Sequence, residues 1–279
     1  MDLQLSLEEA QKVLKGVTIP PRPTLLVSLN QELQKDDPDL RRVAALIAKD
    51  VAISAAMLKT VNSPLFGLRN KLGNIPQAVQ VLGLRNVRNL VTGLVLRKAM
   101  GGPGLSLERF WDSSEKVASI SVYLCSLLPR SPREDAYTFG IFHDCGIPIL
   151  MQRFPDYKET LRLAAGLDVP QTQVEDERHG TNHVVLGYMV AKSWGLPPTI
   201  CDAILRHHDV TVFREEDSTE PTARMLVAIN FLAEHLNDTM VRMRGDEQWE
   251  RVGGQTLEYL GLNHAEYLEL KEDVLNVAA

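Results

Sequence analysis

The sequence predicts an all-α protein, a multi-helix bundle with a smaller N-terminal helical lobe. Apolar residues recur at helical spacing along most of the chain, and capping residues or prolines precede these stretches. No two-residue hairpin turn lies between stretches of alternating polar and apolar residues, so we expect no sheet. A chain of 279 residues with 44% hydrophobic content can bury a large core in one elongated domain or in two lobes.

The N-terminal lobe is expected to consist of short helices joined by tight breaks. Ser6 and Glu9 form a capping box for the first helix. A helix with Leu25, Leu26, Leu29 and Leu33 on one face is expected next. Asp37 is expected to cap the following helix, which begins at the proline after it, and Asp50 is expected to cap the one after that. Asn74 then restarts a helix after a loop. This pattern of cap, apolar stripe and break indicates packed helices rather than strands.

Glycines interrupt the chain at two further points. Gly83 separates the helix that begins near Asn74 from a longer one that ends at Met100. The glycine cluster that follows, residues 101–104, is the expected boundary between the lobes. It lacks the preceding strand and the Lys-Ser/Thr pair of a phosphate loop, which argues against a nucleotide cradle.

The second lobe is expected to begin with a helix over about residues 107–128, capped by Ser106. A capping box of Ser131 and Glu134 then starts the helix that ends in the adjacent pair His143 and Asp144. Later helix starts are expected at Pro155, Pro170, Thr181 or Asn182, Pro197–Pro198, Pro221 and Asn263.

The pair His143 and Asp144 is the first candidate for chemistry. An aspartate at the C-terminal end of a helix faces the negative end of the helix dipole, so Asp144 needs a cation, hydrogen-bond donors or water nearby. Either a bound metal ion or a hydrogen bond from His143 could stabilise the charge of Asp144. His183 falls in the first turn of a later helix, and His207 and His208 fall in the last turn of another, where protonated imidazoles would complement the dipole.

Other motifs argue against several enzyme classes. His179 and His183 are four residues apart, but a glycine interrupts them and the glutamate of a His-Glu-x-x-His protease is missing. No Gly-x-Ser-x-Gly elbow of a serine hydrolase occurs. Cys125, Cys145 and Cys201 are isolated, which suits a reducing compartment and small core side chains. The N-terminus lacks the features of a signal peptide and no apolar run is long enough for a membrane span, so we expect a cytoplasmic protein.

The net charge of −6 argues against a protein whose whole surface is basic and binds nucleic acid, but the charge is unevenly distributed. Residues 51–107 contain seven basic residues and no acidic one. Arg85 and Arg88 share a helix face, and with Arg69 and Lys71 they form the expected contact surface for an acidic partner. The alternative is that these residues balance the acidic C-terminal helices.

Several stretches together resemble the HDOD domain, an all-helical bacterial signalling module related to HD-domain phosphohydrolases. The resemblance spans about residues 20–215. It leaves residues 1–19 as a preceding helix and linker, and 216–279 as C-terminal helices that pack on the HD-like lobe. The matching stretches are Asp50 to Gly67, Gln77 to Leu84, Phe110–Trp111, Phe142 to Asp144, His183, Trp194 to Pro197 and His207–His208.

The resemblance implies a degenerate metal site. In catalytic HD proteins a histidine on an earlier helix, the His-Asp pair and a later aspartate surround one or two metals, which activate water for attack on phosphate. The matching first position is Ser113 and the last is Asn230, and neither is a good replacement ligand. We therefore expect no catalytic residue, no resident metal and no cofactor. If the site were active, its residues would be His143, Asp144, His183, His207 and His208, which resemble the histidine set of HD-GYP phosphodiesterases without the Gly-Tyr-Pro motif.

The resemblance therefore predicts a non-catalytic regulatory module that contacts a signalling protein, with a response-regulator or second-messenger pathway as its setting and no membrane partner. One alternative is a metal-dependent phosphohydrolase or cyclic-dinucleotide phosphodiesterase. A third is nucleotide or nucleic-acid binding by a basic face made of Arg85, Arg88, Arg97 and Lys98.

Overall fold

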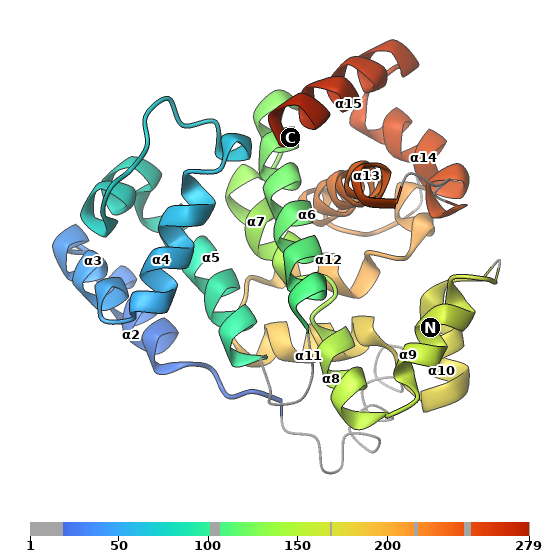
Figure 1. The fold of residues 1–279 in the computed structure, drawn as a ribbon, viewed down its shortest axis with the longest axis horizontal. Helices are drawn as coiled ribbons and strands as arrows, with labels where there is room; N and C mark the ends of the chain where they lie inside the picture. The colour runs from blue at the N-terminus through green and yellow to red at the C-terminus, as the bar shows by residue number, and fades with distance from the viewer. Residues whose placement is uncertain (1–18, 101–106, 168, 215–216, 243–246, 279) are drawn as a thin grey trace.

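The computed structural model describes residues 19–100, 107–167, 169–214, 217–242 and 247–278. Every regular element in these ranges is helical and none is a strand, which confirms the predicted all-α class (Figure 1). The expected first helix with its Ser6 cap, the glycine cluster at 101–104 and the Ser106 cap lie outside the described residues.

The N-terminal lobe packs three short helices against one long helix. These elements are α2 (Thr24–Leu33), α3 (Leu40–Ala48), α4 (Val51–Val61), the 3₁₀ helix η1 (Pro64–Phe66) and α5 (Ile75–Ala99). Gly83 interrupts α5 with φ 75° and ψ 163°, so the predicted break is confirmed. Helix α5 contacts α2, α3 and α4 as well as α7 of the second lobe, so it is one of the elements that connect the lobes.

Of the three caps predicted in the described part of this lobe, two are confirmed. Asp50 and Asn74 each accept a hydrogen bond from the backbone N–H three residues further on. The Asp37 cap was wrong, because α3 begins after Asp39, whose carboxylate accepts from two backbone N–H groups of the first turn. The buried carboxylate of Glu32 accepts from the backbone N–H of Asp39 and thereby holds the turn two residues later than expected.

The second lobe is built around α7, which contacts α5, α6, α12 and α13. Its α-helices are α6 (Glu108–Leu127), α7 (Arg133–Phe142), α8 (Gly146–Arg153), α9 (Tyr157–Ala164), α10 (Gln171–His179), α11 (His183–Ser193), α12 (Pro198–Arg206), α13 (Pro221–Arg242), α14 (Glu247–Leu260) and α15 (His264–Ala278), with the 3₁₀ helix η2 (Val210–Phe213) after α12. A Cβ on Gly140 of α7 would lie 2.6 Å from the Cα of Ala118, so this glycine permits the close packing of α6 on α7.

The capping box predicted from Ser131 and Glu134 is not formed. Helix α7 starts after Pro132 without a side-chain cap, and the Ser131 hydroxyl lies 2.8 Å and 2.7 Å from two carbonyl oxygens at the end of α6. The Ser131 hydroxyl therefore donates hydrogen bonds to free carbonyl groups at the end of α6, and it does not accept from the N–H groups at the start of α7. Asn182 and Asn263 cap α11 and α15 as predicted.

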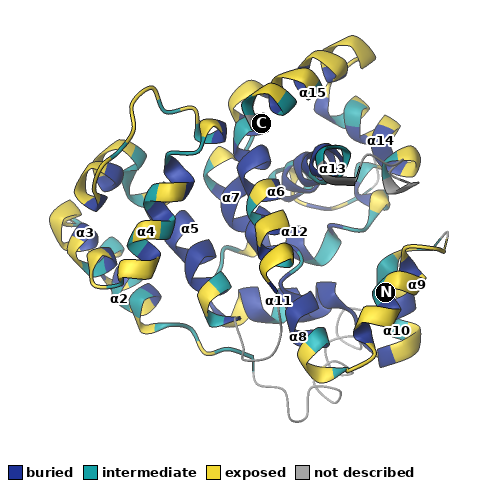
Figure 2. Ribbon diagram, viewed as in Figure 1, coloured by how far each residue is buried: buried dark blue, intermediate teal, exposed yellow. Residues whose placement is uncertain are grey.

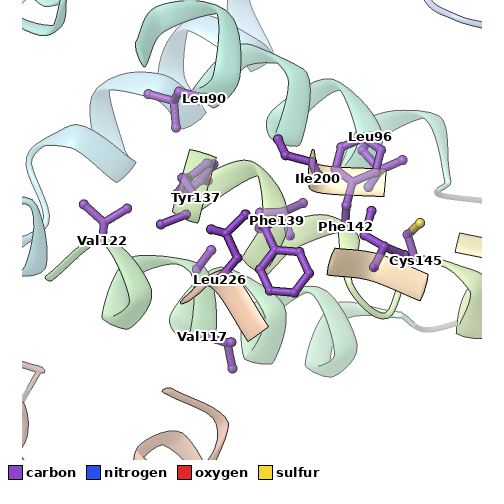
Figure 3. Close-up of a cluster of buried hydrophobic side chains, with 14 of the residues drawn as sticks. Leu90, Leu96, Val117, Val122, Tyr137, Phe139, Phe142, Cys145, Ile200 and Leu226 are labelled. Carbon is purple, nitrogen blue, oxygen red and sulfur yellow. The ribbon is translucent and has the colours of Figure 1, made fainter. Parts of the chain in front are cut away.

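One core runs through both lobes. Figure 2 shows buried residues concentrated on α5, α7 and α13, and exposed residues along α3 and α15. Figure 3 shows side chains from α5, α6, α7, α12 and α13 meeting, with Phe139 and Phe142 of α7 among them. All eight residues 135–142 are buried, so the C-terminal end of α7 is fixed deep in the molecule. Within the described ranges, no helix is both long and apolar enough to cross a membrane.

Candidate metal centre

The structure brings together all five residues that the sequence analysis assigned to a residual HD site. His143 and Asp144 follow the last residue of α7, His183 opens α11, and His207 and His208 follow α12. Asp144 Oδ1 lies 3.3 Å from Nε2 of His183 and 3.3 Å from Nε2 of His207. His183 Nε2 is also 3.4 Å from Nε2 of His207 and 3.1 Å from that of His208.

In His143, His183 and His207, the Nδ1 atom, on the side of the ring away from the cluster, contacts a hydrogen-bond acceptor. The Nδ1 contacts are His143 with the Gly140 carbonyl at 2.8 Å, His183 with Glu175 Oε2 at 2.7 Å and His207 with the Ile204 carbonyl at 2.7 Å. A nitrogen that faces a carbonyl or carboxylate oxygen must carry the proton. Where such a ring is neutral, its Nε2 atom keeps a free lone pair that points toward the cluster.

Glu175, on α10, is the carboxylate behind His183. It is fully buried and also accepts hydrogen bonds from the Tyr157 hydroxyl at 2.5 Å and from Gln171 Nε2 at 2.9 Å. Burial alone would raise the pKa of Glu175, but His183 and these hydrogen bonds hold it below its usual value, so the carboxylate stays charged. A carboxylate that holds an imidazole in this way is a recurrent support for metal-binding histidines.

Glu234, on α13, is a member of the site that the sequence analysis missed. Its Oε1 lies 3.1 Å from His143 Nε2, which also lies 3.4 Å from Asp144 Oδ2. Burial would lower the pKa of His143, but the two carboxylates raise it well above its usual value. Glu234 is one helical turn after Asn230, the position that the HD resemblance had singled out, so helical spacing could have revealed it.

The surroundings of His207 and His208 at the end of α12 do not favour the protonated form that would complement the helix dipole. Burial lowers the pKa of His207, and Asp144 does not fully compensate. Burial and the nearby rings of His207 and His183 lower the pKa of His208 well below its usual value. Both rings are therefore neutral near pH 7, which is the form that binds a metal.

The residues present fit a single divalent metal ion. One oxygen of Asp144 and one nitrogen each of His183, His207 and His208 lie within 4.8 Å of one another. Four ligands held tetrahedrally at about 2.1 Å from an ion are roughly 3.4 Å apart, close to the contacts observed. Three imidazole nitrogens and one carboxylate oxygen suit zinc, iron, nickel or copper. His143, Asp144 and Glu234 form a second such group that shares Asp144.

The two positions that weakened the metal prediction have different surroundings. Ser113 is exposed, and its hydroxyl accepts a hydrogen bond of 3.0 Å from Asn237 Nδ2. Asn230 is buried, and neither of its amide atoms has a hydrogen-bond partner within the described chain. A buried amide without partners is costly unless a further group satisfies it. Neither residue belongs to the four ligand groups, which converge without them.

The family model of the HDOD domain matches residues 19–210 of the chain. The chain belongs to the HDOD domain family. It is 25% identical in sequence to an HDOD domain protein of unknown function from Geobacter sulfurreducens, with a TM-score of 0.72 over 99% of this chain and 97% of that one. It has the same fold as a protein from Shewanella amazonensis SB2B that is named as a candidate phosphohydrolase. That structure has 22% identity and a TM-score of 0.70, over 97% of this chain and 94% of that one.

The HDOD chain is also similar to longer proteins. It is 24% identical over 200 residues to an uncharacterized protein of Treponema pallidum (strain Nichols). That match covers 71% of this chain but only 39% of the relative.

Three basic residues of the HDOD N-terminal lobe form ion pairs with carboxylates from other elements. Arg85 pairs with Glu134 at 2.5 Å, Arg97 pairs with residues of α6, and Lys98 pairs with Asp50 at 2.5 Å. The carboxylates that balance these three residues therefore come from α4, α6 and α7 and not from the C-terminal helices. Arg69 and Lys71 are exposed, and Arg88 is half-buried against Asn89. The partner surface stays a prediction.

Proposed function

We propose that this HDOD chain is a regulatory module of a signalling pathway, which acts through contacts with a protein partner and turns over no substrate. The observation that carries this proposal is the state of Ser113 and Asn230 at the positions where catalytic HD proteins are expected to place a histidine and an aspartate. A serine engaged with Asn237 and a neutral amide supply no anionic or imidazole ligand. The family membership supports the regulatory role.

In this proposal the cluster stabilises the folded structure and takes no part in catalysis. Asp144, His183, His207 and His208 would hold one divalent metal, which joins the end of α7 to the start of α11 and the end of α12. His183 and His207 have fully buried side chains, whereas the side chain of Asp144 is 24% exposed. An ion held mainly by buried rings is placed to fix three helix ends.

A metal-dependent phosphohydrolase or phosphodiesterase is the second candidate, because the four ligand atoms converge on one point. A metal bound there would activate water or polarise a phosphoryl oxygen. His143 holds a proton at Nε2, between Asp144 and Glu234. In this second candidate, His143 would be the general acid that donates this proton to the leaving group. The side chain of Glu234 is 25% exposed, so the edge of this group reaches the surface.

A hydrolysis assay separates the two candidates. The protein would be loaded in turn with manganese, iron, nickel and zinc, and incubated with bis(p-nitrophenyl) phosphate and with cyclic di-GMP. We expect rates equal to those of the Asp144→Ala variant treated identically. Metal-dependent hydrolysis that the Asp144→Ala change abolishes would overturn the non-catalytic proposal and establish the second candidate.

A further inference from the structure

A cavity separate from the metal centre lies between the two lobes. Its volume is about 200 Å³, and its walls come from the segment leading into α2, from α2, α5 and α7, and from the turn between α11 and α12. No residue of the metal centre lines it. The polar and aromatic residues that matter here are Arg22, Asn30, Arg88, Asn89, Thr138 and Trp194.

Two guanidinium groups line this cavity, and neither forms an ion pair with a carboxylate in the described part of the chain. Arg88 points its Nε and Nη2 atoms at one neutral oxygen of Asn89, at 3.3 Å and 3.4 Å. The Nε atom of Arg22 is buried and has no hydrogen-bond partner among the residues that the structure describes. Burial lowers the pKa of Arg88, Asp135 opposes this, and the charges of Arg85 and Arg22 lower it further, so the two cavity cations repel each other.

The position of Arg22 is fixed by the second lobe. Trp194 Nε1 donates to the Pro20 carbonyl at 2.8 Å and so ties the segment that carries Arg22 to the end of α11. Gly195 follows with φ 72°, and a Cβ there would lie 3.3 Å from Arg22 Nη1. The absence of a side chain at Gly195 lets the guanidinium lie against this turn. Two cations without an ion-pair partner in the described residues are therefore held at one cavity by packing, at an electrostatic cost that an anion would reduce.

We propose that this cavity binds a small anionic metabolite through a carboxylate or phosphate group placed between Arg22 and Arg88. Guanidinium groups are the side chains best suited to these planar or tetrahedral oxyanions. The volume is below the roughly 300–1,000 Å³ typical of drug-sized ligands, which favours a small molecule. Asn30 and Thr138 add polar atoms, and Trp194 offers an apolar wall.

Occupancy of the cavity would connect the lobes. The ligand would contact α2 and α5 on one side and α7 and the α11–α12 turn on the other. It would therefore stabilise the arrangement in which the lobes are packed together, because it binds that arrangement better than any in which they separate. The inference stands independently of whether the histidine cluster holds a metal or acts on a substrate.

Isothermal titration calorimetry tests the inference with two probes, sodium phosphate and sodium malonate, at an ionic strength held constant with sodium chloride. The variants are Arg22→Gln and Arg88→Gln. The matched control is Arg41→Gln, since Arg41 is an exposed arginine of α3 outside the cavity. We expect at least one probe to bind the wild-type protein and the control equally. Each cavity variant should bind it about ten-fold or more weakly, because it loses one charge-assisted contact.

The outcomes distinguish the two sources of anion. Binding of phosphate alone assigns a phosphorylated ligand, and binding of malonate alone assigns a carboxylate. Failure of both probes to bind at about 20 mM, well above the micromolar to millimolar range of ordinary metabolite sites, would overturn the proposal. Equal affinity in the wild type and both cavity variants would do the same, provided circular dichroism shows the variants folded at the titration temperature.

Discussion

Individual carboxylates decide how the histidine cluster is arranged, and the two most informative were missed in the sequence. Glu175 lies eight residues before His183 in a helix rich in charged residues, and nothing in that pattern marks it as the buried one. Its burial depends on α10 packing against α9 and α11, which is a tertiary effect. Glu234 could have been predicted from the sequence, because it lies one turn beyond Asn230 on the same helix. A side chain that supports the site can thus be predicted from sequence only where a motif already shows which face of its helix points toward the site.

Replacing Glu175 by alanine tests its supporting role. We expect E175A to lower the free energy of unfolding by about 3 kcal/mol, because it leaves the His183 and Tyr157 donors buried without their acceptor. Urea denaturation followed by circular dichroism measures this loss. E177A is the matched control, since Glu177 is exposed on the same helix, and it should change stability by less than about 0.5 kcal/mol. Equal stability of the two variants would contradict the role assigned to Glu175.

Helix boundaries show where local sequence rules succeed and where they are overridden. The caps at Asp50, Asn74, Asn182 and Asn263 follow from local chemistry and are all observed. Two boundaries failed because residues distant from the cap acted on it. Glu32 holds the turn before α3, and the end of α6 takes the hydroxyl expected to cap α7.

The corrected start of α3 gives a direct comparison of neighbouring aspartates. Asp39→Ala should destabilise the protein by about 1 kcal/mol, because it removes the acceptor for two N–H groups of the first turn. Asp37→Ala should cost less than about 0.5 kcal/mol, because Asp37 is exposed and lies outside the helix. Thermal unfolding of both variants measures the difference. The reverse order would restore the original sequence-based assignment.

The cap at Asp50 predicts a pH dependence. Its contact with Lys98 and its bond to the first turn of α4 hold the pKa of Asp50 below the ordinary 3.8, despite an opposing effect of burial. Its stabilisation is therefore fully present above pH 3.8 and is lost as the pH falls through the lowered value. We expect Asp50→Ala to cost about 1 kcal/mol at pH 7 and progressively less below pH 3.8. A deficit that stays constant down to pH 2.5 would contradict this.

At the scale of the whole molecule, sequence periodicity predicted the helical class but could not predict which distant residues meet. The stretch 51–107 has no acidic residue, yet Arg85, Arg97 and Lys98 all find carboxylates, because α5 lies against α4, α6 and α7. In the same way, the histidines that seemed separate helix-end features share one centre with Asp144. The HDOD resemblance gave the members of that centre, whereas their separations and ring orientations come only from the packing of α7, α11 and α12.

We propose that this cluster is a single-metal centre that stabilises the fold, whereas the sequence predicted a metal-free hydrogen-bonding pair. Elemental analysis of the purified protein, expressed with supplementary manganese, iron, nickel and zinc, tests it most directly. We expect about one metal ion per chain in the wild type and almost none in His183→Ala, with Arg41→Gln retaining the wild-type amount. A wild-type protein that is folded but carries less than about one tenth of an equivalent of any of these metals would contradict the claim.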